Sequence, residues 1–366
     1  ALLGGLFLAF LAGAARGSFG REVAWASPLL ALGTLGLLVP MHEAQPASAT
    51  LASIAAVYWG IALSNTNRKI AIPLIGCGLG ATFLAGGLVA VLPTLTLLAI
   101  LLVRRHWWAA GSAALIGSII ALAWPTVLAL VHPAHLEGWW TTEIATITPR
   151  NPFSLAHLQW LGWFAWPVLL IAGWTIWHNR RHLAGGPLAA PVLGTGTALA
   201  WLLLHEPKVT VTLPLLPPLM LLAAAGCQHL RRGAANAWDW FGMMTFSLLV
   251  GLTWLGASAL LLGWPPKVAA NAAKIAPGFA ASISAPALAV ALAATVGWLA
   301  VLSRLPRSPW RAAFRWAAGV TALWLLVVAL LMPWIDYGKT YRPVVVSLRQ
   351  ALPPDSDCIA RRGLGA

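Results

Sequence analysis

Long apolar runs separated by short polar stretches dominate the chain. Twelve such runs, each of roughly 14 to 24 residues, lie near 1–15, 24–40, 49–63, 70–84, 87–103, 112–131, 158–177, 187–204, 210–227, 240–263, 281–303 and 316–333. A helix that crosses a bilayer needs about 20 apolar residues. The pattern therefore predicts an all-α fold, a polytopic transmembrane helix bundle of about twelve spans.

The polar stretches between the runs predict how the chain is organised. Residues 1–333 are expected to form the helix bundle with short loops. Within it, residues 132–158 are expected to lie along the outer membrane surface, because Trp139 and Trp140 are typical of an interfacial helix. Residues 334–366 follow the last run as a polar tail. We also expect the chain to be a fragment of a longer protein at both ends.

Composition excludes several classes of protein. The chain has 366 residues, of which 60% are hydrophobic and 9% charged, whereas a soluble domain averages about 25% charged residues. A soluble enzyme, a disulfide scaffold and a disordered chain are therefore excluded. The net charge of +14 invites a nucleic-acid partner. However, the basic residues occur as short pairs between apolar runs, which is typical of topology signals, and we expect no nucleic acid.

The charges between the runs also predict orientation. If residues 16–23 are cytoplasmic and the spans alternate, that side holds fourteen of the 23 basic residues: Arg16, Arg21, Arg68, Lys69, Arg104, Arg105, Arg180, Arg181, Arg231, Arg232, Arg304, Arg307, Arg311 and Arg315. The opposite side holds seven of the nine acidic residues: Glu43, Glu137, Glu143, Glu206, Asp336, Asp355 and Asp357. Positively charged short loops stay in the cytoplasm. We therefore expect a multi-pass membrane protein whose acidic, histidine-bearing face points outward, which is the periplasmic side if the membrane is a bacterial inner membrane.

Three stretches carry a resemblance to a known family. They are GCGLGATFLAGGLVAVLP at 76–93, HEPKVTVTLPLLPPLMLLAAAG at 205–226 and HPAHLEGWWTTEI at 132–144. In order and spacing they resemble GT-C glycosyltransferases of family 39, which include protein O-mannosyltransferases and the aminoarabinose transferases that modify lipid A. The segment at 333–353 resembles the start of the outer C-terminal domain of bacterial members, which implies that residues 334–366 are the truncated start of a C-terminal periplasmic domain.

The resemblance implies a function and partners. It implies an integral-membrane glycosyltransferase that transfers a sugar from a polyprenyl-phosphate-linked donor to an acceptor hydroxyl at the periplasmic face. The partners would be membrane lipids, that donor, and a lipid A, polysaccharide or protein acceptor. The family's catalytic carboxylate lies in a large outer loop before this region, so the catalytic residue is unknown here and this fragment alone is expected to be inactive.

Candidate substrate-binding residues come from the short outer loops. Sugar transfer from a lipid phosphate needs a carboxylate near the acceptor and cations near the departing phosphate. The candidates are Glu43, Gln45, Glu143, His205, Glu206 and Lys208. Gln45 takes the place of an Asp that usually opens this span in the family. The alternative interpretation of each of these residues is that it is a solvent-exposed residue at the end of a loop, without a role in binding.

Two departures from the family keep other functions open. The turn Ala85-Gly86-Gly87 lacks the lysine that is usual there. This and the Gln45 change favour the alternative of a non-catalytic, degenerate membrane scaffold. A transporter is a weaker alternative, because no charged residue lies in the middle of a span.

A metal site is not expected. His132, His135 and Glu137 lie close together in sequence, but they lack the i, i+4 spacing of two histidines on a zinc-binding helix. We therefore expect no cofactor, with a divalent cation as the alternative.

Overall fold

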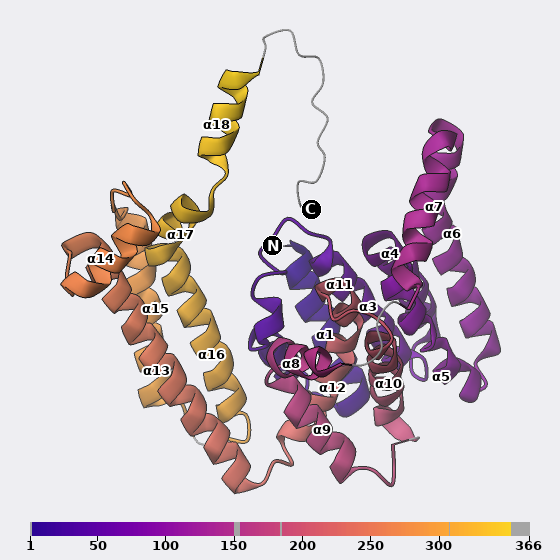
Figure 1. Cartoon of the computed structure of the whole chain (residues 1–366). Coiled ribbons are helices and arrows are strands. Elements are labelled where there is room, and N and C mark those ends of the chain that lie inside the picture. Colours follow the sequence, from indigo (N-terminus) through magenta and orange to yellow (C-terminus); the bar gives the residue numbers. More distant parts are fainter. Residues whose placement is uncertain (1, 150–153, 184, 307, 353–366) are drawn as a thin grey trace. The chain divides into compact units, whose positions relative to one another are not determined.

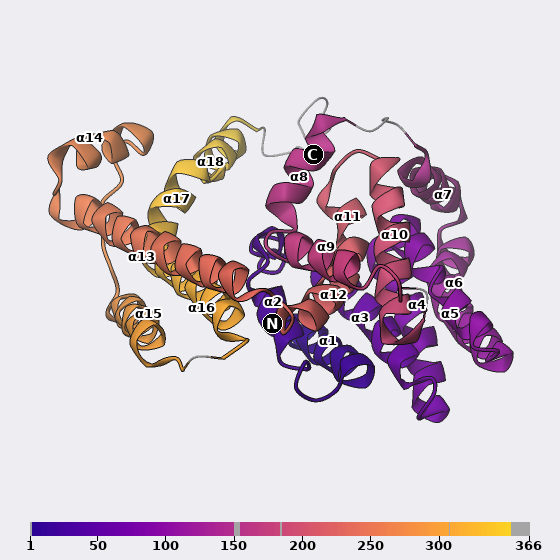
Figure 2. The same ribbon diagram turned by 90° about the horizontal axis from the view of Figure 1, so that it is seen from below.

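The computed structural model describes residues 2–149, 154–183, 185–306 and 308–352, and within these ranges the chain forms helices and no strand (Figures 1 and 2). The predicted all-α class is confirmed. The first α-helices are α1 (Leu2–Phe19), α2 (Ala26–Leu32), α3 (Ala47–Leu63), α4 (Arg68–Leu95), α5 (Leu98–Val103), α6 (Trp107–Val131), α7 (Pro133–Ile147), α8 (Leu155–Phe164) and α9 (Val168–His178). The others are α10 (Ala189–Leu203), α11 (Val209–Thr212), α12 (Leu216–Cys227), α13 (Arg232–Leu262), α14 (Pro266–Ile275), α15 (Ala285–Arg304), α16 (Arg311–Leu326), α17 (Met332–Lys339) and α18 (Arg342–Ala351).

The chain divides into two compact units, which we describe separately. Unit 1 consists of Ala1–Thr245 and Ala300–Thr321, and unit 2 of Phe246–Leu299 and Ala322–Ala366. The boundary predicted after residue 333 lies inside unit 2, within α17. Residues 353–366 lie outside the described ranges, so the C-terminal periplasmic domain stays a prediction.

Eight helical segments in the described ranges are long and apolar enough to cross a membrane, or nine if one bent pair counts as a span. The difference from the predicted twelve has four local reasons. Run 24–40 is broken, run 49–63 forms the 17-residue α3, runs 70–84 and 87–103 join into one segment, and run 158–177 forms α8 and α9, which meet at 101°.

Run 24–40 is not the continuous spanning helix that we expected. Only the seven-residue α2 and the 3-10 turn Leu35–Leu37 form there, and Thr34 between them is extended. The run nevertheless returns along α1. The Ser27 hydroxyl donates to the Leu11 carbonyl at 3.3 Å, and the terminal methyl of Met41 lies against Gly4. The chain therefore retraces α1 as a broken segment, because Gly33 and Thr34 interrupt the helix.

The segment Arg68–Val103 doubles back at Gly87. This glycine has φ 65° and ψ −164°, inside what is otherwise α4. The two ends of the segment meet, since Arg68 Nη2 donates to His106 Nε2 at 2.8 Å. The segment is thus a hairpin of two helices, as the separate runs 70–84 and 87–103 predicted.

The core of unit 1 is built around α12. This helix packs against α1, α2, α3, α9 and α10 (Figures 1 and 2). Of the apolar window that contains it, 83% is buried inside the protein. A helix that is apolar on every side is expected at the centre of a bundle, and LPPLMLLAAAGC has that composition.

Unit 1 has two distinct helix ends. Gly17, Asn65, Arg104 and Gly186, which come from predicted cytoplasmic loops or the helix ends beside them, line one cavity of about 490 Å³. We call this the inner end. Residues from the predicted periplasmic segments near 83–89, 142–148 and 205–211 contribute the lining of another cavity, and we call this the outer end. The structure therefore gathers the loops predicted to be cytoplasmic at one end of unit 1 and those predicted to be periplasmic at the other. Arg307, Asp355 and Asp357 lie outside the described residues.

Unit 2 is held by indole hydrogen bonds between its helices. Trp254 Nε1 in α13 donates to the Thr295 hydroxyl in α15 at 3.0 Å, and Trp298 Nε1 donates to the Ser247 hydroxyl at 3.3 Å. Trp334 Nε1 in α17 donates to the Ala272 carbonyl in α14 at 3.3 Å. In lipid, such bonds satisfy polar groups that have no water nearby.

Candidate functional site

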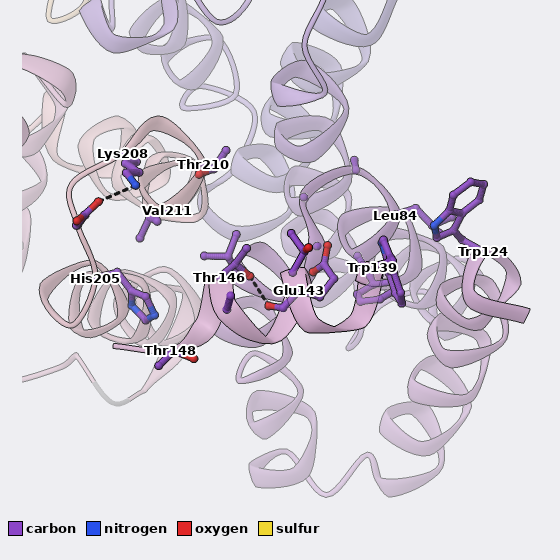
Figure 3. Close-up of a pocket in the computed structure, with 18 of the residues that line it drawn as sticks. Leu84, Trp124, Trp139, Glu143, Thr146, Thr148, His205, Lys208, Thr210 and Val211 are labelled. Atoms are coloured by element: carbon purple, nitrogen blue, oxygen red, sulfur yellow. Dashed lines mark hydrogen bonds and ion pairs between the residues drawn. The ribbon is translucent and has the colours of Figure 1, made fainter. Parts of the chain in front are cut away.

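A cavity of about 950 Å³ opens at the outer end of unit 1 (Figure 3). Most of its wall comes from α4, α6 and α7 and is apolar, formed by Phe83, Leu84, Val89, Ala123, Trp124, Val127, Trp139 and Val211. Four of the predicted site residues also line it: Glu143, His205, Glu206 and Lys208. A pocket with an apolar wall and a few polar groups is the usual form of a small-molecule site.

Glu143 holds the α4 hairpin turn in place. Its Oε2 accepts a hydrogen bond from the backbone N–H of Leu88 at 3.0 Å. A Cβ at Gly87 would lie 2.6 Å from the same oxygen, so the carboxylate sits directly on the glycine. The positive φ and this close approach both require glycine at position 87. Gly87 thus forms the turn itself.

Helix α7 carries Glu143 and is otherwise loosely attached. No described residue of α7 is buried. Besides Glu143, the contact to α4 is an edge-to-face pair of Trp139 and Phe83 with ring centroids 6.3 Å apart. Helix α7 thus lies within the segment 132–158, whose place at the membrane surface stays a prediction, while residues 150–153 lie outside the described ranges.

The loop 204–208 supplies the cation of the pocket. Lys208 Nζ forms an ion pair with Glu206 Oε2 at 2.6 Å, and the two side chains are 65% and 42% exposed. Pro207 removes a backbone donor and separates α10 from α11. An ion pair this exposed contributes about 0–1 kcal/mol, so an anionic ligand can compete for Lys208. Within the described residues, Lys208 is the basic residue that lines this cavity.

His205 is buried, and its ring has a defined tautomer. The ring Nδ1 lies 2.7 Å from the Trp201 carbonyl, so Nδ1 carries the proton and donates it. Nε2 is then a lone-pair acceptor in the neutral ring. It is buried and has no hydrogen-bond partner among the described residues. His205 therefore offers the pocket a nitrogen that can take a proton or a hydrogen bond.

His157 supports this loop and was missed in the sequence. Its Nδ1 accepts from the Ser154 backbone N–H at 3.2 Å, and its Nε2 donates to the His205 carbonyl at 2.8 Å. Ser154 and His157 form a capping box at the start of α8. The spacing Ser-x-x-His resembles the Ser-x-x-Glu capping box. This pattern could have predicted a helix that begins after Ser154, but it could not have predicted the hydrogen bond between His157 and His205.

Glu43 and Gln45 are not brought into the pocket. Both are exposed in the stretch before α3, and neither lines the cavity. They lie near it, because Thr50 in the first turn of α3 packs against Gly86. Their role in substrate binding stays a prediction.

The histidines of the outer segment do not gather a metal site in the part of the chain that the structure describes. The rings of His132 and His135 have centroids 5.7 Å apart. No group of three or more His, Cys, Asp or Glu side chains suited to a metal ion occurs there. The polar groups of the pocket are suited to an anion and to hydroxyls instead.

The arrangement suits an amphiphilic ligand. Its apolar part fits the wall of Leu84, Trp124 and Val127, and its anionic part fits Lys208. Glu143 and His205 add acceptors for hydroxyl groups.

Solved structures with this fold are known. ArnT from Cupriavidus metallidurans bound to undecaprenyl phosphate matches with a TM-score of 0.64 and 19% identity, over 97% of this chain and 66% of that chain. The apo state of the same protein matches with a TM-score of 0.62 and 18% identity, over 97% and 65%. This chain thus spans just under two thirds of ArnT. No protein-family model and no curated protein matches it. The GT-C fold expected from the sequence motifs is confirmed.

Proposed function

We propose that this chain is the body of an integral-membrane glycosyltransferase. It takes a sugar from a polyprenyl-phosphate-linked donor and passes it to an acceptor hydroxyl at the periplasmic face of a bacterial inner membrane. The acceptor would be a lipid A, a polysaccharide or a protein.

The observation that carries the proposal is the pocket at the outer end. Its apolar wall continues into a polar rim that holds Lys208, His205 and Glu143. A polyprenyl phosphate has the same division, with a hydrocarbon chain and an anionic head. The ArnT structure of the same fold was determined with undecaprenyl phosphate bound, which supports this class of ligand.

The chemistry assigns each group a part. Lys208 contacts the donor phosphate as a point charge and stabilises it as it leaves. Glu143 and His205 bind sugar or acceptor hydroxyls, and Glu206 keeps Lys208 oriented until the donor arrives. The catalytic carboxylate is expected from an outer loop that precedes these residues in the family, so we assign no catalytic residue here.

The test removes the cation. In the full-length protein, Lys208→Ala should weaken use of the lipid-linked donor by about tenfold or more, because a charged hydrogen bond contributes about 1.5–3 kcal/mol. Lys208→Arg should keep part of the activity, since the charge remains while its geometry changes. Donor turnover in membranes supplied with a polyprenyl-phosphate sugar is the measurement.

The matched control is Lys267→Ala, in the exposed helix α14, and it should change donor use by less than twofold. If Lys208→Ala behaves like Lys267→Ala, the donor phosphate binds elsewhere. Absence of any turnover in the full-length wild type would favour a non-catalytic membrane scaffold instead. The turn 85–87 supports that alternative, because it brings no lysine to the pocket.

A further inference from the structure

A second cavity, of about 390 Å³, lies in unit 1 between α9 and the start of α13. Its walls are apolar and aromatic, with Trp166, Leu170 and Trp174 on one side and Trp238 and Phe241 on the other. It shares no lining residue with the pocket at the outer end. We call it the tryptophan groove.

Two hydrogen-bond donors in this groove have no acceptor. The indole Nε1 atoms of Trp174 and Trp238 are buried, and neither has a hydrogen-bond partner among the described residues. An N–H without an acceptor is costly in an apolar environment, and no water is present in hydrocarbon to satisfy it. Two such donors in one groove indicate a ligand that carries oxygen acceptors on an apolar body.

The groove leads to a cluster of basic and aromatic side chains at its Trp174 end. The Arg231 guanidinium lies over the Trp174 ring, 5.6 Å from its centroid. Trp174 stacks on His178 with centroids 5.7 Å apart, and His178 stacks on His229 at 6.3 Å.

The charge of the two adjoining loops is entirely positive. Residues 178–186 and 228–233 contain Arg180, Arg181, Arg231 and Arg232 and no acidic residue. Cations are therefore concentrated where α9 ends and α13 begins, beside an apolar groove. Basic pockets between transmembrane helices are suited to anionic lipid head groups.

We propose that the tryptophan groove binds an anionic glycerophospholipid of the membrane. Its phosphate contacts Arg231 and the His178–His229 pair, and its ester oxygens accept from the Trp174 and Trp238 indoles. One acyl chain lies along Leu170 and Phe241. The lipid completes the hydrogen bonding of α9 and α13, and this site is independent of the proposed sugar transfer.

The test compares two lipids by native mass spectrometry of the purified protein. Phosphatidylglycerol should bind at least about tenfold more tightly than phosphatidylcholine, because the choline cation of phosphatidylcholine offsets its phosphate charge and is repelled by the basic loops. Arg231→Gln should remove most of that preference without affecting the fold, because Arg231 is exposed. Trp174→Phe combined with Trp238→Phe keeps an aromatic ring at each position and removes both donors, and it should weaken binding of both lipids by about fivefold or more.

Two controls make the outcome decisive. Arg21→Gln removes the same charge from another exposed inner loop, and Trp25→Phe removes an indole that is 76% exposed. Both should bind phosphatidylglycerol within twofold of wild type. Equal binding of the two lipids by wild type, or an Arg231→Gln variant that keeps the preference, overturns the proposal. The circular dichroism and thermal midpoint of each variant show whether it is folded.

Discussion

The two ends of unit 1 use charge in different ways. At the inner end, arginines donate to carbonyls in the last turns of helices: Arg104 to Ile61 at 3.1 Å, Arg180 to Trp177 at 3.0 Å and Arg315 to Leu302 at 2.9 Å. Carbonyls in the last turn of a helix lack the usual i+4 donor, and a cation there also interacts favourably with the helix dipole. At the outer end, Lys208 forms an ion pair with Glu206 in an exposed loop beside the pocket.

The difference teaches that net charge alone does not locate the function of this chain. Most of its positive charge lies at the inner end, where several arginines contact helix-end carbonyls. Of the charged groups at the outer end, Glu143, Glu206 and Lys208 line a cavity of about 950 Å³. Substitution of a buried ion-paired group at the inner end should therefore change mainly stability, whereas substitution of a group that lines the outer pocket should also change donor binding.

The largest effect on stability is expected at the inner end, for Asp239→Ala. Asp239 is buried, and its Oδ2 accepts from Arg311 Nη2 at 2.8 Å and Arg315 Nη1 at 2.9 Å. Its removal leaves two arginines without their counter-charge, which should cost about 3–5 kcal/mol. Thermal unfolding in detergent micelles measures the loss. Glu22→Ala removes an exposed acid of the same end and should change stability by less than about 0.5 kcal/mol. A similar loss in both variants would contradict the role of this pair.

An intermediate effect is expected at the outer end, for Gly87→Ala. The backbone at φ 65° and ψ −164° is unfavourable for a residue with a Cβ, and that Cβ would meet the Glu143 carboxylate. The variant should lose about 1–3 kcal/mol and should also bind the donor more weakly, because the turn lines the pocket.

The matched control for that variant is Gly111→Ala in α6, where a Cβ would meet nothing within 4 Å. It should be neutral or slightly stabilising, since alanine is the better helix former. If Gly87→Ala leaves both stability and donor binding unchanged, the turn is less constrained than the geometry indicates.

The smallest effect concerns pH at the inner end. Burial, together with the charges of Arg68 and Arg104, lowers the pKa of His106 below its ordinary 6.5. Because the folded pKa lies below the unfolded one, this histidine contributes stability that is present above about pH 6.5 and is lost as the pH falls through the folded value. The thermal midpoint should drop by less than about 2 °C across that window. In His106→Gln, which keeps an acceptor for Arg68 and does not titrate, this part of the pH dependence should disappear.

The fold could be predicted from the sequence to the extent that it follows from apolar runs. Runs of the right length gave the helices, and the hairpin at 70–103 was expected as two runs. The prediction of one continuous helix over run 24–40 was wrong. The hydropathy of the run does not show that the helix is interrupted at Gly33 and Thr34. The bend between α8 and α9 was likewise invisible to a count of apolar residues.

The site was predictable only in part. Glu143, His205, Glu206 and Lys208 were selected as polar groups in outer loops, and the structure brings them to one cavity. Glu43 and Gln45 were selected by the same reasoning and lie outside it. The loop that a residue belongs to can be read from the sequence, whereas the direction of its side chain depends on packing between distant segments, as between His157 and His205.

The hairpin at Gly87 has a consequence for how the chain enters the membrane. Arg68 and His106 meet at one end of a 36-residue apolar segment, while its turn reaches the other end of unit 1. Each half has fewer than 20 residues between its polar flanks, which is marginal for a stable span on its own. The two halves should therefore partition into the bilayer together, with the small uncharged turn Ala85-Gly86-Gly87 as the part that translocates. Glu143 is synthesised more than 50 residues after this turn, so it can bind the turn only after α6 has also crossed the membrane. The pocket is therefore completed late in biogenesis.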